Sequence, residues 1–270
     1  MNGALNLSVT PSRMLAGMSV EDRLRLKPLL HRQEILARTY LERASCPIEQ
    51  IYFIESGIVS LLEARDMREP LEVGVIGCEG MTGGATILGN LNPDRDSYVQ
   101  VSGQALVLSR EDLHCAIMES LTLGRYLLRY MQTQMAQLSL AVSAGIRASV
   151  QQRLARKLLM YHDRLRVDDL PLTHETMSIM LGVRRASITL AIHNLEAERW
   201  IKAQRGLVTI RDRVGLEAYC GSFYGIAEAQ YAAIMEQPIG VLPSFTPGEL
   251  MGRPTHLLVS PGADMIGRTQ

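Results

Sequence analysis

Residues 172–198 read LTHETMSIMLGVRRASITLAIHNLEAE, and this stretch decides the fold of the C-terminal half. Thr173 can accept a hydrogen bond at a helix N-terminus, and Glu175 suits the first turn. Gly182 can supply the positive φ angle of a sharp turn. Apolar residues then recur with a helical period at Ile188, Ile192 and Leu195. A short helix, a glycine turn and a longer helix predict a helix-turn-helix.

A helical hairpin inside an ordinary bundle would show the same pattern, so the next residues are needed to choose between the two. Residues 200–210 read WIKAQRGLVTI, which predicts a strand, a tight turn at Arg205-Gly206 and a second strand. A hairpin directly after the second helix forms a wing, and a basic wing tip commonly contacts backbone phosphate. The two segments together favour a winged helix-turn-helix.

A long helical pattern precedes this unit and starts near residue 121. Residues recur every seven positions in two sets, namely Leu121, Leu128, Met135 and Val142, and three positions later Gly124, Met131, Leu138 and Gly145. Such an a/d seam favours a second copy of the same helix as its partner, and hence a homodimer. A core helix packed within its own domain is the alternative. The predicted dimer contacts are Leu121, Leu128, Met131, Met135, Leu138 and Val142.

The N-terminal half has the pattern of short antiparallel strands across residues 35–108. The first run, IYFIESGIVSLLEA at 51–64, is rich in β-branched and aromatic residues and is broken by a Ser56-Gly57 turn signal. The later runs are LEVGVIG (71–77), ATILG (85–89) and DSYVQVSGQALVL (96–108). Short strands at this spacing predict an antiparallel sandwich or roll.

The net charge of zero hides a basic segment. Residues 147–213 carry 13 Lys and Arg against 7 Asp and Glu, a surplus of +6, and both flanking segments are mildly acidic. Local basic charge suits attraction to nucleic-acid phosphate without general adhesion. An ordinary charged helical surface would give the same totals.

Other classes of protein find little support in the sequence. No run of 18 apolar residues suggests a membrane span, and no signal-peptide pattern opens the chain, so we expect a cytoplasmic protein without a membrane partner. The four cysteines have no spacing typical of a metal site. No nucleophile has a plausible base beside it, so we predict no catalytic residues, no metal and no enzyme.

In order and type, these elements resemble the Crp/Fnr family of bacterial transcription regulators over roughly residues 25–219. The resemblance implies an α+β fold with an N-terminal antiparallel β-roll, a long dimerisation helix and a C-terminal winged helix-turn-helix. It also implies a homodimer that binds double-stranded DNA at a two-fold symmetric operator, with RNA polymerase as a further candidate partner.

The resemblance implies a β-roll sensor domain of the cyclic-nucleotide-binding type (21–118), the dimerisation helix (119–147) and the winged helix-turn-helix (148–219). The weak patterning of residues 1–20 predicts a flexible N-terminus, and the proline and glycine content of residues 238–267 predicts a largely irregular C-terminal extension (220–270). Within the extension, residues 224–237 have the composition of one helix.

The family's DNA contacts carry over onto the second helix of the motif. Arg185 matches the arginine that reads guanine, which can accept two hydrogen bonds from a guanidinium. Ala186 stands where a glutamate is frequent, and could touch a thymine methyl group instead. Leu190 stands where a second arginine is common, so the operator should differ from the best-known family site. The predicted DNA-binding residues are Thr173, Arg184, Arg185, Ala186, Ser187, Thr189 and Arg205.

The effector is harder to predict. Family members that bind cyclic nucleotides carry a Gly-Glu pair and a later arginine, and the corresponding residues here are Glu79, Gly80, Met81 and Arg95. A methionine in place of the carboxylate leaves the ribose hydroxyl without its acceptor. We therefore predict no cyclic-nucleotide cofactor, with Glu79, Gly80 and Arg95 as the candidate effector pocket. The alternatives are a cyclic-nucleotide-activated regulator, or a signalling or interaction module without specific DNA binding.

Overall fold

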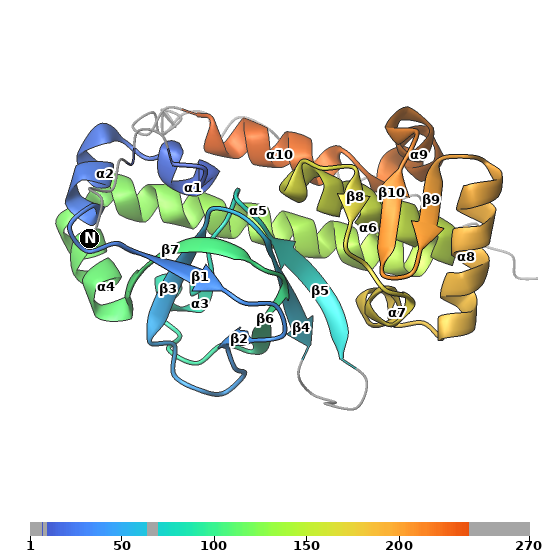
Figure 1. Cartoon of the computed structure of the whole chain (residues 1–270). Coiled ribbons are helices and arrows are strands. Elements are labelled where there is room, and N and C mark those ends of the chain that lie inside the picture. Colours follow the sequence, from blue (N-terminus) through green and yellow to red (C-terminus); the bar gives the residue numbers. More distant parts are fainter. Residues whose placement is uncertain (1–6, 8–9, 64–69, 238–270) are drawn as a thin grey trace, which may run out of the picture. The chain divides into compact units, whose positions relative to one another are not determined.

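The computed structural model describes residues 7, 10–63 and 70–237 (Figure 1). Its N-terminal half contains two antiparallel sheets. One sheet has the order β1 (His31–Ile35), β7 (Gly103–Ser109), β3 (Gln50–Ile54), and the other has the order β2 (Tyr40–Glu42), β6 (Arg95–Val101), β4 (Ile58–Glu63), β5 (Leu71–Ile76). Side chains from both sheets share a buried cluster, which includes Ile54, Val59 and Val107. The predicted antiparallel roll is confirmed.

The turn between β3 and β4 requires glycine. Gly57 has a φ angle of 87°, and a β-carbon there would lie 2.5 Å from the Val101 carbonyl oxygen. An L-residue would therefore be strained and would also collide with the backbone.

One predicted strand is wrong. The ATILG run forms a single helical turn, α3 (Gly84–Ile87), between β5 and β6. Gly83 before it and Gly89 after it both have positive φ angles, which bend the chain out of an extended path at each end. A run of only two or three β-branched residues does not override such turns.

Residues 10–20 are ordered, so the prediction of a flexible N-terminus is wrong for this part. Ser12 caps α1 (Arg13–Ala16), and Ser19 caps α2 (Val20–Leu26). Met14 and Leu15 are fully buried, and the Met14 carbonyl accepts a hydrogen bond of 2.9 Å from the Tyr126 hydroxyl. A few apolar residues therefore anchor this segment without showing any sequence period.

After β7, helix α4 (Arg110–Glu119) leads into α5 (Leu121–Arg147), which has two apolar faces. The inward face packs on the roll through buried residues that include Leu123, Tyr126, Leu127 and Tyr130. The first heptad set lies elsewhere, and Leu121, Leu128, Met135 and Val142 are 69%, 51%, 53% and 62% exposed. This set therefore forms a surface stripe, whereas Met131 and Leu138 of the second set are half-buried and Met131 packs against the core.

The C-terminal half begins with α6 (Val150–Leu165), which starts with the capping box of Ser149 and Gln152. The chain continues as β8 (Asp169–Leu170), α7 (His174–Leu181), α8 (Arg185–Ala197), β9 (Ile201–Gln204), β10 (Leu207–Ile210) and α9 (Arg213–Cys220). The wing is a three-stranded sheet of order β8-β10-β9, and its edge strand β8 was not predicted. A strand of two residues is too short to show an alternating pattern.

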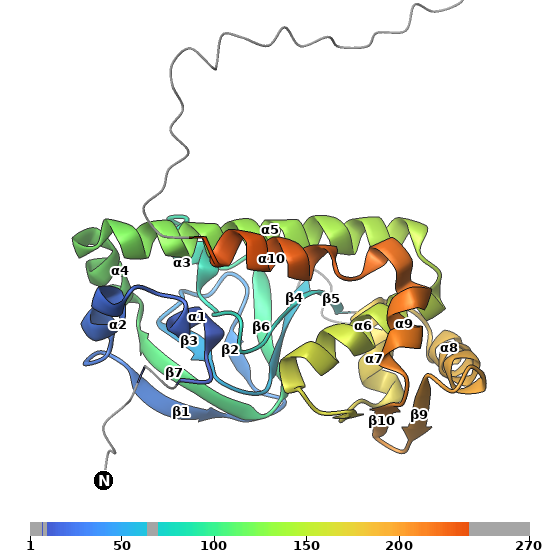
Figure 2. The same cartoon turned by 90° about the horizontal axis from the view of Figure 1, so that it is seen from above.

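The helix predicted within residues 224–237 is present as α10 (Ile226–Met235), after a 3₁₀ turn at Gly221–Phe223. Figure 2 shows α10 running beside α5. Met235 joins the buried cluster of the roll, and the Tyr231 hydroxyl donates a 2.7 Å hydrogen bond to the Glu79 carbonyl. The irregular extension predicted beyond residue 237 lies outside the described residues. In the described part, no helix combines the length and the hydropathy needed to cross a bilayer.

Candidate nucleic-acid interface

Helices α7 and α8 form the predicted helix-turn-helix. The Thr173 hydroxyl accepts a hydrogen bond of 3.0 Å from the Thr176 backbone N–H, which fixes the start of α7. Gly182 ends α7 with a φ angle of 59°. The apolar faces of the two helices meet in the buried core of this half, and the contributing residues include Met177, Met180, Leu181, Ile188, Ile192 and Leu195. Packing thus sets which face of α8 points outward.

The outward face of α8 carries most of the predicted DNA-binding residues. Arg184, Arg185, Ala186 and Thr189 are exposed, while Ser187 is half-buried. Arg184 is the N-cap residue and makes no side-chain capping bond. The first backbone N–H groups of α8 have no partner within the helix, and with the helix dipole they favour an anion at this end.

A groove of about 880 Å³ lies between α8 and the wing. Its lining includes Thr173, Arg185, Thr189 and Arg205, so four of the predicted residues share one concave surface. The groove also contains His174, His193 and Gln204. His174 and Gln204 could not be predicted as binding residues, because only the packing of the wing against α7 and α8 brings them to this surface.

The wing is held by its edge strand. The Thr209 hydroxyl donates a 2.6 Å hydrogen bond to the Asp169 carboxylate, and β10 pairs with both β8 and β9. Gly206 takes a φ angle of 76° at the tip, next to the exposed Arg205. The tip therefore presents a cation beside the groove.

Much of the basic charge counted in this segment faces inward. Arg156 and Lys157 are only 5% and 6% exposed, and Arg164 forms a buried ion pair with Glu79 at 2.8 Å. The exposed basic residues of the helix-turn-helix and wing are Arg184, Arg185, Arg199, Lys202, Arg205 and Arg211. The charge available to nucleic acid is therefore smaller than the sequence total indicates.

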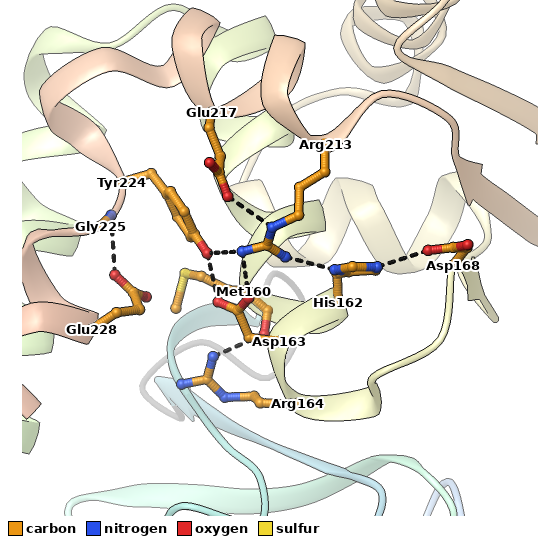
Figure 3. Close-up of polar contacts among 10 residues, drawn as sticks. All are labelled: Met160, His162, Asp163, Arg164, Asp168, Arg213, Glu217, Tyr224, Gly225 and Glu228. Carbon is orange, nitrogen blue, oxygen red and sulfur yellow. Dashed lines mark hydrogen bonds and ion pairs between the residues drawn. The ribbon is translucent and has the colours of Figure 1, made fainter. Parts of the chain in front are cut away.

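A polar network joins α6, α9 and the segment before α10 (Figure 3). Arg213 donates hydrogen bonds of 2.7 Å to Glu217 and Asp163, and Asp163 also accepts one of 2.7 Å from Tyr224. A nitrogen of the Arg213 guanidinium lies 2.6 Å from Nδ1 of His162, and Nε2 of His162 lies 2.9 Å from Asp168. Because arginine only donates, Nδ1 accepts and the proton lies on Nε2. No local pattern around His162 predicts this structural role.

The predicted effector pocket is not assembled as expected. Arg95 lines a cavity of about 320 Å³ between the roll and α5, together with Met81, and pairs with Asp94 at 2.9 Å. Glu79 and Gly80 do not line that cavity. Glu79 instead pairs with Arg164 of α6, because the chain turns it toward the C-terminal half.

The same cavity contains a carboxylate that sequence reasoning missed. Glu42 accepts a 2.6 Å hydrogen bond from Ser97, and burial raises the pKa of its carboxyl group. Glu42 belongs to β2, and only the pairing of β2 with β6 brings it near Arg95.

Among known protein families, the Crp-like helix-turn-helix domain matches residues 152–219 of this chain. No curated protein matches the sequence.

Many solved structures share the fold. A protein of Eubacterium rectale assigned to the crp/fnr family aligns with a TM-score of 0.62 and 17% identity, over 78% of this chain and 98% of that one. FixK2 of Bradyrhizobium japonicum gives 0.61 and 12%, over 71% and 98%. The c-di-GMP-responsive regulator CLP of Xanthomonas campestris gives 0.58 and 17%, over 71% and 99%. The structural likeness thus extends from the roll to the wing.

Proposed function

From the Crp-like helix-turn-helix domain and the Crp/Fnr fold that the chain has, we propose that the protein is a transcription regulator that binds a two-fold symmetric DNA operator as a homodimer in the cytoplasm. The observation that carries this proposal is the exposed face of α8, where Arg185 lines the groove beside the wing. A protruding helix face flanked by a basic wing suits the major groove and the phosphates beside it.

Within this interface, each residue has a proposed role. Arg185 donates two hydrogen bonds to a guanine, and Ala186 contacts a thymine methyl group. Thr173, Arg184, Ser187 and Arg205 contact phosphates and fix the register of the protein on the duplex, and Thr189 adds a contact on the same face of α8.

The exposed stripe on α5 supports the homodimer. Leu121, Leu128, Met135 and Val142 are each more than half exposed, although they recur along one helix. An apolar stripe of this kind is unfavourable in water and is stabilised when a second helix covers it. Two copies related by a two-fold axis would present two α8 helices to successive major grooves.

We expect Met135→Asp to dissociate the dimer, because it places a carboxylate without a partner in the middle of the apolar seam. The dissociation constant should rise roughly 100-fold or more, as measured by sedimentation equilibrium at micromolar concentration. Val214→Asp is a matched control, since Val214 is 74% exposed on α9 and lies off the stripe. An unchanged dissociation constant for Met135→Asp would contradict the proposed interface.

The proposed function is tested by selecting random duplex DNA with the purified protein and sequencing the bound pool. We expect a motif with two inverted half-sites about one helical turn apart, each containing a guanine for Arg185. A pool without enrichment, obtained with protein that sediments as a dimer, would contradict specific DNA binding.

A further inference from the structure

A second cavity lies where the roll meets the winged helix, away from the predicted DNA contacts. This junction cavity has a volume of about 340 Å³ and is lined by β5, the C-terminal half of α5, α6 and α7. Its walls are mainly apolar and include Leu71, Val73, Leu138, Ala141, Met180 and Leu181. Cavities of this size, at the junction of two domains and with few polar groups, are typical of small-molecule sites.

The charged side chains that line the junction cavity carry more positive than negative charge. Arg153, Arg156 and Lys157 lie on one face of α6, and among the described residues that line the cavity Glu72 is the only acid. Lys157 forms an ion pair with Glu72, which also accepts hydrogen bonds from Ser60 and Tyr161. Glu72 is thus matched by Lys157, and Arg156 lies within electrostatic reach of Glu228, so that the positive charge of Arg153 is left over.

Arg153 and Arg156 each have more N–H donors than the hydrogen bonds they make. Arg153 donates one hydrogen bond to the Leu181 carbonyl, and Arg156 donates one of 2.9 Å to the Phe223 carbonyl. A guanidinium has five N–H donors, so these bonds leave most of them available. Burial lowers the pKa of both guanidinium groups. A bound carboxylate would supply the missing charge and accept hydrogen bonds from them.

We propose that the junction cavity binds an organic anion with an apolar body, of the class of medium-chain carboxylates. The arginines of α6 would bind the carboxylate, and the hydrocarbon chain would lie against the walls from β5, α5 and α7. A volume of about 340 Å³ lies within the range of small-molecule sites and accommodates a hydrocarbon chain of medium length. A nucleotide fits less well, because its ribose and base would leave polar groups against apolar walls.

Such a ligand would contact the roll and the winged helix at once. Leu71 and Glu72 belong to β5 of the roll, whereas Met180 and Leu181 belong to α7 of the helix-turn-helix. Occupancy would therefore favour one orientation of α8 relative to the roll, and only this regulatory consequence rests on the proposed DNA-binding function. Ligand binding itself is tested without DNA.

The test is calorimetric titration of the full-length protein with octanoate and with 1-octanol, which has the same chain length without the charge. We expect one octanoate per chain and an affinity for 1-octanol at least tenfold lower. Arg153→Met should weaken octanoate binding about tenfold or more and leave 1-octanol unchanged. Arg211→Met removes an exposed arginine outside the cavity and should change neither affinity.

Four results would overturn the proposal. The first is the absence of saturable octanoate binding to folded wild-type protein, and the second is equal affinity for octanoate and 1-octanol. The third is an unchanged octanoate affinity in Arg153→Met. The fourth is octanoate binding only at concentrations that dissociate the dimer in sedimentation, which would show that a second copy of the chain fills the cavity.

Discussion

Replacing Arg185 with alanine is expected to weaken binding to the selected operator by roughly 10- to 100-fold, since a bidentate arginine–guanine contact contributes about 1–3 kcal/mol of discrimination. Arg185 is the first residue of α8 and is exposed, and no contact of its side chain holds the described part of the protein together. The fold should therefore survive the change, so the loss reports on DNA. Binding is measured by fluorescence anisotropy at fixed salt, with the operator and with a scrambled duplex.

Binding to the scrambled duplex should change only about twofold, because nonspecific affinity depends on total charge near the phosphates. Arg211→Ala is the matched control, since it removes the same charge from an exposed position outside α8 and the groove. It should affect both duplexes alike. Equal losses on both duplexes in Arg185→Ala would show that Arg185 contacts phosphate and reads no base.

The second large effect is expected at the buried ion pair between the roll and α6. Lys157→Met should lower the free energy of unfolding by about 3–5 kcal/mol, because it leaves the Glu72 carboxylate buried without its cation. The Glu72 side chain is only 1% exposed and that of Lys157 only 7%, so water cannot replace the lost partner. Urea denaturation followed by circular dichroism measures the change.

A double variant separates the pair from the packing around it. Glu72→Leu combined with Lys157→Met removes both charges and should recover most of the lost stability, since an apolar pair is tolerated where half an ion pair is not. Arg25→Met breaks an ion pair whose side chains are 37% and 65% exposed, and should cost less than about 1 kcal/mol. A similarly small cost for Lys157→Met would mean that the Glu72 site is hydrated or protonated.

The ion pair of Glu72 and Lys157 also links the roll to the winged helix-turn-helix. Glu72 belongs to β5 of the roll and Lys157 to α6, which starts the winged helix-turn-helix. Arg164 and Glu79 make a second link between the same two parts at 2.8 Å, and Tyr231 of α10 donates to the Glu79 carbonyl. A ligand that disturbs either side of these links would alter the position of α8, which is the element proposed to read DNA.

Elements whose signals are local could be predicted from the residues alone. Thr173 and Gly182 fixed the two ends of α7, and Ser149 with Gln152 fixed the start of α6, because capping bonds and positive φ angles involve neighbours only a few residues away. The heptad repeat located the exposed stripe of α5 for the same reason, since a helix places every seventh residue on one face. From these elements the helix-turn-helix and its outward residues could be predicted.

Which charges are buried and what they contact follows from the tertiary structure alone. Arg156 and Lys157 are both buried, and Lys157 pairs with Glu72, which lies 85 residues earlier in the chain. Glu79 forms an ion pair with Arg164 of α6 and does not line the roll cavity that contains Arg95. Helix α10 packs beside the roll and buries Met235 in its core. No local period encodes such contacts, because burial depends on the surface that a distant segment supplies. The outward side of α8 could therefore be predicted from sequence, whereas the junction cavity could not.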